Sequence, residues 1–480
     1  MGTRKQRTRQ QDMWIPQAEL PTAPSHPFYQ KLAELLEAEQ FDEFVEAVCA
    51  KYYAPKYGRR SLTPGIYFRS LLIGYFEGVD SERGIAWRMA DSLALRRFVG
   101  IAWDEETPDH STISRTRRRM ALEAHQEVFR WILGRLADRG LVNGKRMGID
   151  ATTLEANAAM RSIVRRDSGA SYEEFLRGLA KASGMETPTR EELARLDRKR
   201  KKRMSNQEWR SPADGDARIT KMKDGRTHLA HKAEHAVDMD TGAVLAVTLQ
   251  GADLGDTTTV HQTLAEAGMA VAEQISREAE LRPQEKPKVN VRGVEELVGD
   301  KGYHSGAVLA TVRSYGIRTY LPEPKQPPQN GRRKWEGKAE EQKAVYANRR
   351  RMQGGYAKKL LRRRGELLER SFAHCYETGA MRRTHLRKHD NILKRQLIHI
   401  GAFNLSLLLR QTLGAGTPRE WRNRGVALFL LTYWAILCQA GWNSLDPANV
   451  FRFRTASCVG RRNRTARRRC RNSAAFTTGC

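Results

Sequence analysis

Three acidic residues stand in sequence contexts that suit catalysis. Asp150 and Asp300 each follow a short apolar segment containing glycine, as expected at the end of a strand, and Glu369 lies in a segment with helical character. The carboxyl ends of strands in an open sheet face a ligand-binding crevice. We therefore expect Asp150 and Asp300 to end two strands of one sheet and Glu369 to project from a helix.

Carboxylates gathered from separate elements repel one another unless a hard cation lies between them, and Mg²⁺ prefers oxygen ligands. Two such ions about 3.5–4 Å apart can clamp the attacking and leaving oxygens of a phosphodiester. We expect two ions, Mg²⁺ or Mn²⁺, with Asp150 as the bridging ligand. An Asp after a strand is more often a turn or helix cap than a metal ligand, so neither aspartate establishes a site by itself.

The charge balance of the chain points to a polyanionic partner. The 480 residues include 84 Lys plus Arg and 55 Asp plus Glu, a formal net charge of +29. Nucleic acid is the first candidate partner and an anionic membrane surface the second. The longest apolar run, residues 426–438, is shorter than the roughly 20 residues of a membrane span. With no apolar core in the basic N-terminus and no CxxC pair among six cysteines, we expect a cytoplasmic protein with free thiols.

Several basic residues are placed where they could contact DNA. Four arginines cluster early in a predicted helix over residues 111–136, after a turn, which is where a recognition helix meets DNA. Packing in a helical bundle is an equal alternative for that helix, though not for four arginines within five residues. A solvated basic face explains the cluster at Arg382, Arg383 and Arg387 equally well. The candidate DNA-binding residues are Arg115, Arg117, Arg118, Arg119, Lys301, Arg370, Arg382, Arg383 and Arg387.

The pattern along the chain predicts an all-α domain followed by an α/β domain. We expect a basic arm at 1–27, a helical domain at 28–143 with Trp87 and Trp131 in its core, and a mixed-sheet domain at 144–412. A charged helical insertion interrupts the sheet domain at about 165–212, and residues 413–480 form an irregular basic tail. A zinc site at His228, His231 and His235 is a weaker alternative, because that segment has the pattern of a strand.

Three motifs in this order resemble the signatures of DDE transposases of bacterial insertion sequences: GIDATTLEANA (148–158), VGDKGYHS (298–305) and RRRGELLERSFAH (362–374). Residues 58–100 and 106–119 resemble the N-terminal domain associated with the same group. The resemblance implies an RNase H-like core in which Asp150, Asp300 and Glu369 form a Mg²⁺-binding triad. It also implies a nucleoid-associated protein that binds the ends of an insertion sequence, cuts the DNA and transfers the strand to target DNA, as a homodimer in the active complex.

The third motif departs from the related signature. Gly365 and Tyr376 stand where that signature has basic residues, and Glu366, one helical turn before Glu369, is a rival for the third acid. The tail after about residue 413 matches nothing in the family. Two other functions stay open: a catalytically inactive DNA-binding protein derived from a transposase, and a different RNase H-like nuclease.

Overall fold

The structure, a computed structural model, describes residues 26–54, 61–102, 104–200, 204–222, 225–324 and 335–423. Its contacts divide the chain into two units, Met1–Trp421 and Arg422–Cys480, and the fold below belongs to the first. Nearly all of the predicted arm, most of the predicted tail and the apolar run at 426–438 lie outside the described residues. None of the helices in the described ranges is long and apolar enough to span a membrane.

The part of the chain before the first strand is helical. Thr63, Ser81, Ser92 and Asp109 each accept a backbone hydrogen bond at a helix start, as N-cap residues do. The helices are α1 (Pro27–Ala38), α2 (Phe41–Cys49) with the 3₁₀ turn η2 (Ala50–Tyr52), α3 (Pro64–Phe76), α4 (Glu82–Ala90), α5 (Leu93–Val99), α6 (His110–Arg119) and α7 (Leu122–Asp138).

The prediction of one long helix over 111–136 was wrong, because the chain breaks between α6 and α7. Met120 and Ala121 are extended. Lys394, from a helix near the C-terminal end of the described chain, donates its Nζ to the carbonyl oxygens of Met120 at 2.8 Å and Arg117 at 3.5 Å. A distant ammonium therefore satisfies carbonyls that the end of α6 leaves free.

The prediction of a core position was also wrong for Trp87, which is 65% exposed on α4. Trp131 is partly buried as expected, with its ring against Phe41 and Phe44.

A six-stranded mixed sheet follows the helical part. Its path runs β4-β5-β1-β7-β8, and β6 pairs with β5 beside β4. The strand β5 is antiparallel to β1, β4 and β6, whereas β1, β7 and β8 are parallel. The strands are β1 (Arg146–Glu155), β4 (Arg218–Lys221), β5 (Thr227–Asp238), β6 (Val244–Gly251), β7 (Glu296–Val298) and β8 (Arg318–Tyr320).

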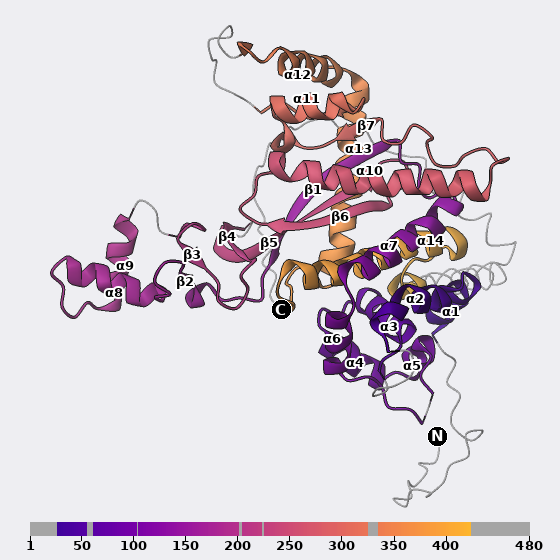
Figure 1. Cartoon of the computed structure of the whole chain (residues 1–480), viewed down its shortest axis with the longest axis horizontal. Coiled ribbons are helices and arrows are strands. Elements are labelled where there is room, and N and C mark those ends of the chain that lie inside the picture. The colour runs from indigo at the N-terminus through magenta and orange to yellow at the C-terminus, as the bar shows by residue number, and fades with distance from the viewer. Residues whose placement is uncertain are drawn as a thin grey trace, which may run out of the picture. The chain divides into compact units, whose positions relative to one another are not determined.

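Helices cover both faces of this sheet. They are α10 (Asp256–Leu281), the 3₁₀ turn η4 (Lys301–Tyr303), α11 (Gly306–Ser314), α12 (Ala339–Met352), α13 (Gly355–Phe372) with the π-helix η6 (Ala373–Thr378), and α14 (His389–Leu413). Adjacent residues of a strand point to opposite faces. Glu234 of β5 bonds Thr259 and Thr263 of α10, while its neighbour His235 bonds Ser371 of α13. Thus α10 and α13 lie on opposite faces (Figure 1).

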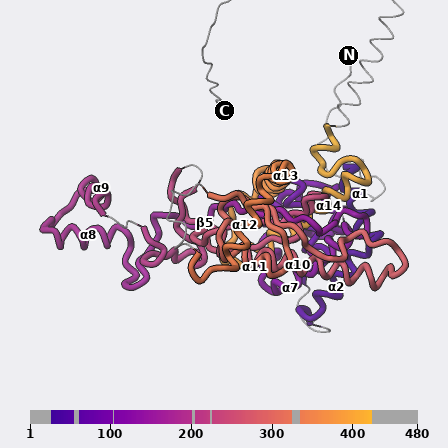
Figure 2. The backbone as a smooth tube through the Cα atoms, turned by 90° about the horizontal axis from the view of Figure 1, so that it is seen from above, coloured from indigo at the N-terminus to yellow at the C-terminus, as the bar shows by residue number. Residues whose placement is uncertain are grey.

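The predicted insertion lies between β1 and β5. It contains η3 (Met160–Ser162), β2 (Val164–Arg165), α8 (Tyr172–Ala182), α9 (Arg190–Lys199) and β3 (Trp209–Arg210). The helices α8 and α9 lie side by side in both views (Figures 1 and 2) and share a small core of Leu176, Ala180 and Leu193. Both begin with a capping box, which explains how a short, charged sequence forms helices.

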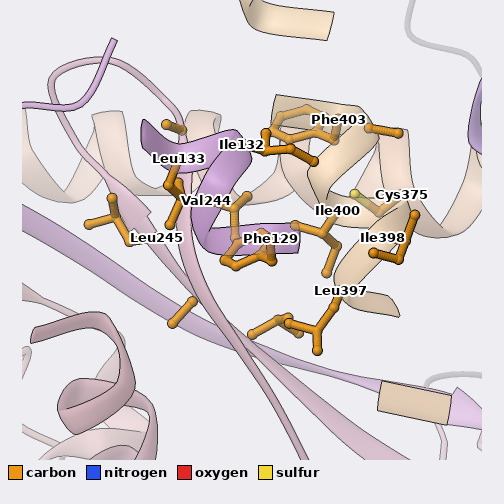
Figure 3. Close-up of a cluster of buried hydrophobic side chains, with 14 of the residues drawn as sticks. Phe129, Ile132, Leu133, Val244, Leu245, Cys375, Leu397, Ile398, Ile400 and Phe403 are labelled. Carbon is orange, nitrogen blue, oxygen red and sulfur yellow. The ribbon is translucent and has the colours of Figure 1, made fainter. Parts of the chain in front are cut away.

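One continuous hydrophobic core joins the N-terminal helices to the sheet. The helix α14 lies at its centre and contacts α3, α7 and β6. Gly401 allows α14 to approach α7, since a Cβ there would lie 2.8 Å from Ile132. Figure 3 shows the side chains that meet in this region, from α7 (Phe129, Ile132, Leu133), β6 (Val244, Leu245), η6 (Cys375) and α14 (Leu397, Ile398, Ile400, Phe403).

A buried arginine also fastens α14 to the N-terminal helices. Arg395 is fully buried and donates to the carbonyl oxygens of Leu71 at 2.9 Å and Val79 at 3.2 Å. Burial lowers its pKa to about 10. Its guanidinium lies against Gly74 of α3, where a Cβ would be only 1.9 Å from Nη2.

We expect Gly74→Ala to lower the free energy of unfolding by about 1–3 kcal/mol, because the added methyl group overpacks against a buried guanidinium. The matched control is Gly178→Ala in α8, where a Cβ meets no atom within 4 Å. That change should raise stability by about 0.5–1 kcal/mol through helix propensity. Urea unfolding monitored by circular dichroism measures both, and equal effects of the two variants would contradict the packing argument.

Candidate active site

The pairing of β1 with β7 places Asp150 beside Asp300. The two strands are parallel, with Gly148 opposite Val298, and each aspartate follows two residues later along its chain. Neighbouring strands lie about 4.8 Å apart, and residues in equivalent positions of a parallel pair share a face. The two carboxylates therefore stand at the same level of the sheet, just beyond the last β1–β7 pair.

The position of Asp150 within its strand differs from the prediction. It was expected to end the strand, but β1 continues to Glu155 because β5 pairs with it along its whole length from Met147 onward. Only the partner β7 stops, after Val298. Asp150 therefore lies at the level where its neighbouring strand β7 has just ended.

The carboxylate of Asp150 is held by a helix on its face of the sheet. Arg364 of α13 donates Nη1 to Asp150 Oδ2 at 2.9 Å and to the carbonyl oxygen of Ile149 at 3.3 Å. The side chain of Asp150 is 28% exposed. Burial raises the pKa of Asp150 above its ordinary value, and the charge of Asp300 adds to this, while Arg364 acts in the opposite direction.

Asp300 lies in a tight turn after β7. Its Oδ1 accepts a hydrogen bond from the backbone N–H of Gly302 at 2.8 Å, so it caps η4. Gly299 permits close packing of this turn, because a Cβ there would lie 2.7 Å from Leu321. The carboxylate is partly exposed. Asp300 therefore caps η4, and its charge also acts on Asp150.

The third acid is not gathered with the first two. Glu369 and Glu366 are both exposed on α13, which packs against β1 on the face of Asp150. The charge of Glu366 acts on Arg370. In the described part of the chain, no hydrogen bond or ion pair holds the Glu369 side chain, and no three His, Cys, Asp or Glu side chains converge as a metal site.

Two adjacent carboxylates nevertheless suit an oxygen-ligated cation. Mg²⁺ is commonly bound through one or two carboxylates and retains several waters. Asp150 and Asp300 meet this requirement, and a cation between them would relieve the repulsion that helps to raise the Asp150 pKa. In this structure Arg364 supplies part of that positive charge. The sequence signal for Arg364 is the run of three arginines at 362–364, shortly before Glu369.

An open groove of about 640 Å³ lies past the end of β1. Arg383 and Arg387 line it together with Glu155 and Asn157. Arg383 and Arg387 are exposed, whereas Arg382 is half-buried and donates to Thr152 Oγ1 at 2.8 Å. The cluster after α13 therefore divides into two arginines that face a groove and one that ties the segment to β1.

The remaining predicted basic residues also have different environments. Arg115, Arg118 and Arg119 are exposed on α6, with Arg119 over the Tyr53 ring at 5.2 Å. Arg117 is 6% exposed and forms an ion pair with Glu82 of α4, so it joins two helices.

Beside the acids, Lys301 is exposed next to Asp300. Arg370 is half-buried, with a guanidinium nitrogen 2.4 Å from where a Cβ on Gly242 would lie.

The three histidines of the alternative zinc site do not converge. His231 and His235 are buried on β5, in the strand that was expected for this segment, and each has a different partner. His231 pairs with Asp214 at 3.2 Å, whereas His235 bonds Tyr376 at 2.6 Å and Ser371 at 3.2 Å. Burial lowers the pKa of His235 to about 3, so this ring is neutral near pH 7 and serves packing between β5 and α13.

Residues 17–119 match the family described as Transposase domain (DUF772). This match supports a transposase. It covers the N-terminal helices through α6 and ends before the sheet that carries Asp150 and Asp300. No curated protein and no solved structure matches the chain.

The raised pKa of Asp150 predicts the stability of a neutral variant. A carboxyl whose pKa is higher in the folded state makes the fold less stable as pH rises from the unfolded-state pKa through the folded one. Without divalent metal, Asp150→Asn should therefore be at least as stable as wild type near pH 7. This advantage should shrink as pH falls through the raised pKa of Asp150 and be gone below about pH 3.8, the ordinary pKa of the group.

Urea unfolding in EDTA across pH measures the difference. A variant less stable than wild type by more than about 1 kcal/mol at pH 7 would show that the Arg364 pair outweighs burial.

Proposed function

We propose that this protein is a DDE transposase that binds the ends of an insertion sequence, cuts the DNA there and transfers the cut strand into target DNA. The observation that carries the proposal is the matched position of Asp150 and Asp300 on the parallel strands β1 and β7. The transposase-domain match at residues 17–119 supports it independently, since it involves none of these acids.

The arrangement of the sheet supports an RNase H-like core. Antiparallel strands β5 and β6 and parallel strands β7 and β8 meet on either side of β1, which carries the first acid at the centre. The helix α13 follows all of these strands in sequence and packs on the Asp150 face. A third acid supplied from α13 would thus approach the site from the correct side. We assign this role to Glu369 and treat Glu366, whose charge acts on Arg370, as its control.

Asp150 and Asp300, completed by Glu369, would hold one or two Mg²⁺ or Mn²⁺ ions. Such ions stabilise the attacking and leaving oxygens of a phosphodiester displacement. The chain supplies the ligands and the partly buried setting in which their charges act strongly. In the proposed reaction, water attacks the phosphorus at the element's end, and the bond from that phosphorus to the element's 3′ oxygen breaks and leaves a 3′-hydroxyl. That hydroxyl then attacks a phosphorus of the target strand. A bond forms between them, and the target's own 3′ oxygen leaves that phosphorus as a hydroxyl, so no covalent bond to the enzyme is needed.

DNA would be held by exposed basic side chains. The exposed arginines of α6 form one candidate surface, for the element's ends. Arg383 and Arg387, which also contact Glu155 and the carbonyl oxygen of Asn157, form a second at the groove past the end of β1. Lys301, exposed next to Asp300, would contact a phosphate there. We leave Arg117, Arg370 and Arg382 outside these surfaces because each is buried or half-buried. A homodimer that joins two ends, acting at the bacterial nucleoid, completes the proposal.

A second function is favoured by the arrangement at Asp150. Arg364 already pairs with this carboxylate, and among the described residues Glu369 belongs to no group of three side chains that could hold a metal ion. A catalytically inactive DNA-binding protein could have the same arrangement of side chains at Asp150. It would bind the element's ends with wild-type affinity and leave them uncut.

The test is cleavage and strand transfer on DNA that carries the element's terminal sequences, with Mg²⁺ or Mn²⁺. Asp150→Ala and Asp300→Ala should each reduce cleavage by more than about 100-fold, because even residues that only support metal ligands typically cost 10–100-fold. Glu369→Gln should reduce cleavage by a similar factor, and Glu366→Gln should retain cleavage activity. Undiminished cutting by both aspartate variants would refute the enzyme assignment. Cutting without a strand-transfer product would indicate a nuclease instead.

A separate experiment tests the α6 surface. The affinity for end DNA should depend on salt, and Arg115→Ala or Arg118→Ala should each lower the slope of log K against log salt by about 1 if the residue contacts a phosphate. The control is Arg177→Ala, an exposed arginine on the insertion helix α8 that pairs with Glu173. Fluorescence anisotropy at several salt concentrations measures the slopes, and unchanged slopes in both α6 variants would place the DNA elsewhere.

A further inference from the structure

A buried lysine lies behind the turn that carries Asp300. Lys232 of β5 is 5% exposed, and its Nζ has three partners. It donates to Asp256 Oδ1 at 2.6 Å, Thr259 Oγ1 at 2.9 Å and the carbonyl oxygen of Leu254 at 3.3 Å. All three ammonium protons are thus used, and the side chain has one defined position at the N-terminal end of α10.

A second buried contact fixes the far end of the same turn. Tyr303, three residues after Asp300, is fully buried and donates its hydroxyl to Glu234 Oε1 at 2.7 Å. Glu234 is also fully buried, lies 3.9 Å from Lys232 and accepts hydrogen bonds from Thr259 and Thr263. The turn from Asp300 to Tyr303 is therefore anchored to β5 and α10 by side chains that take no part in the proposed reaction.

The two parts of this network meet at Gly302. A Cβ on Gly302 would lie 2.2 Å from Asp256 Oδ2 and 3.0 Å from Asp300 Oδ1, so the two carboxylates are neighbours across this glycine. Asp256 is one-third exposed, and its other oxygen is held by Lys232. A third carboxylate thus lies next to the proposed ligand Asp300, and a buried ammonium both restrains it and neutralises it.

We propose that Lys232 and Asp256 are positioning residues that hold the Asp300 turn and set the charge beside it, so that Asp256 stays paired with Lys232 while Asp150 and Asp300 bind the metal. The inference rests on the proposed function, because it assumes a divalent cation at the two aspartates. It assigns neither residue a contact with substrate. Their effect reaches the metal through the backbone of the turn and through the local electrostatic field.

The proposal predicts opposite effects for the two residues. Lys232→Met leaves the Asp256 carboxylate unpaired, so the site becomes more negative and should bind Mn²⁺ at least about threefold more tightly. Asp256→Asn leaves the ammonium uncompensated and should weaken Mn²⁺ binding by a similar factor. The double variant, with both charges removed, should return to within about twofold of wild type.

Mn²⁺ binding to the full-length chain without DNA, followed by electron paramagnetic resonance, gives these affinities independently of activity. Unfolding temperatures in EDTA show whether each variant folds. If Lys232→Met does not fold, the comparison of Asp256→Asn with the double variant still decides the question. A merely structural network predicts that both single variants bind Mn²⁺ more weakly and that the double variant is no better, and this result would overturn the proposal.

Asp150→Asn and Asp300→Asn separate this inference from the proposed function. If wild type binds no Mn²⁺ that these two variants lose, the assignment of the metal site itself fails. If they do lose it while the Lys232 and Asp256 variants do not compensate each other, only the positioning proposal fails.

Discussion

The register of two parallel strands is the constraint on which the candidate site depends. Because Gly148 of β1 pairs with Val298 of β7, Asp150 and Asp300 stand side by side at the point where β7 ends. Burial raises the pKa of the Asp150 carboxyl, and the charge of Asp300 adds to this. The surrounding structure supplies a partner for each carboxylate. Arg364 of α13 donates to Asp150, and the backbone N–H of Gly302 donates to Asp300. Two carboxylates placed in this way suit a divalent cation.

The need to pair buried oxygen atoms with positive groups also explains part of the chain's excess of basic residues. Some of the cations are internal: Lys232, Lys394 and Arg395 are buried, and each satisfies carbonyl or carboxylate oxygens that other elements leave unpaired. Two of these residues join α14 to the N-terminal helices, so the helical part and the sheet share one core. A count of charge therefore overestimates the surface available to DNA. The exposed arginines of α6 and those at the groove past β1 are the better measure.

Local patterns predicted the elements well where the interactions that define them are local. Thr63 and Ser81 cap the helices that follow them, and Asp240 with Gly242 makes the expected turn between β5 and β6. The predictions failed where a distant residue decides the outcome. Lys394 caps the break that divides the predicted helix 111–136, and β5 extends β1 beyond Asp150. Trp87 is exposed because no other element of the described chain covers that face of α4, which the sequence around it cannot reveal.

The sequence by itself determined an α/β protein with a helical N-terminal part and an inserted helical segment, because periodicity and capping act over a few residues. It also nominated Asp150, Asp300 and Glu369 as candidate acids. Only the tertiary structure decided that Asp150 and Asp300 share one level, that Arg364 pairs with the first, and that Lys232 restrains Asp256 beside the second. These contacts join residues 24 to more than 200 positions apart, so they depend on strand register and helix packing rather than on any local pattern.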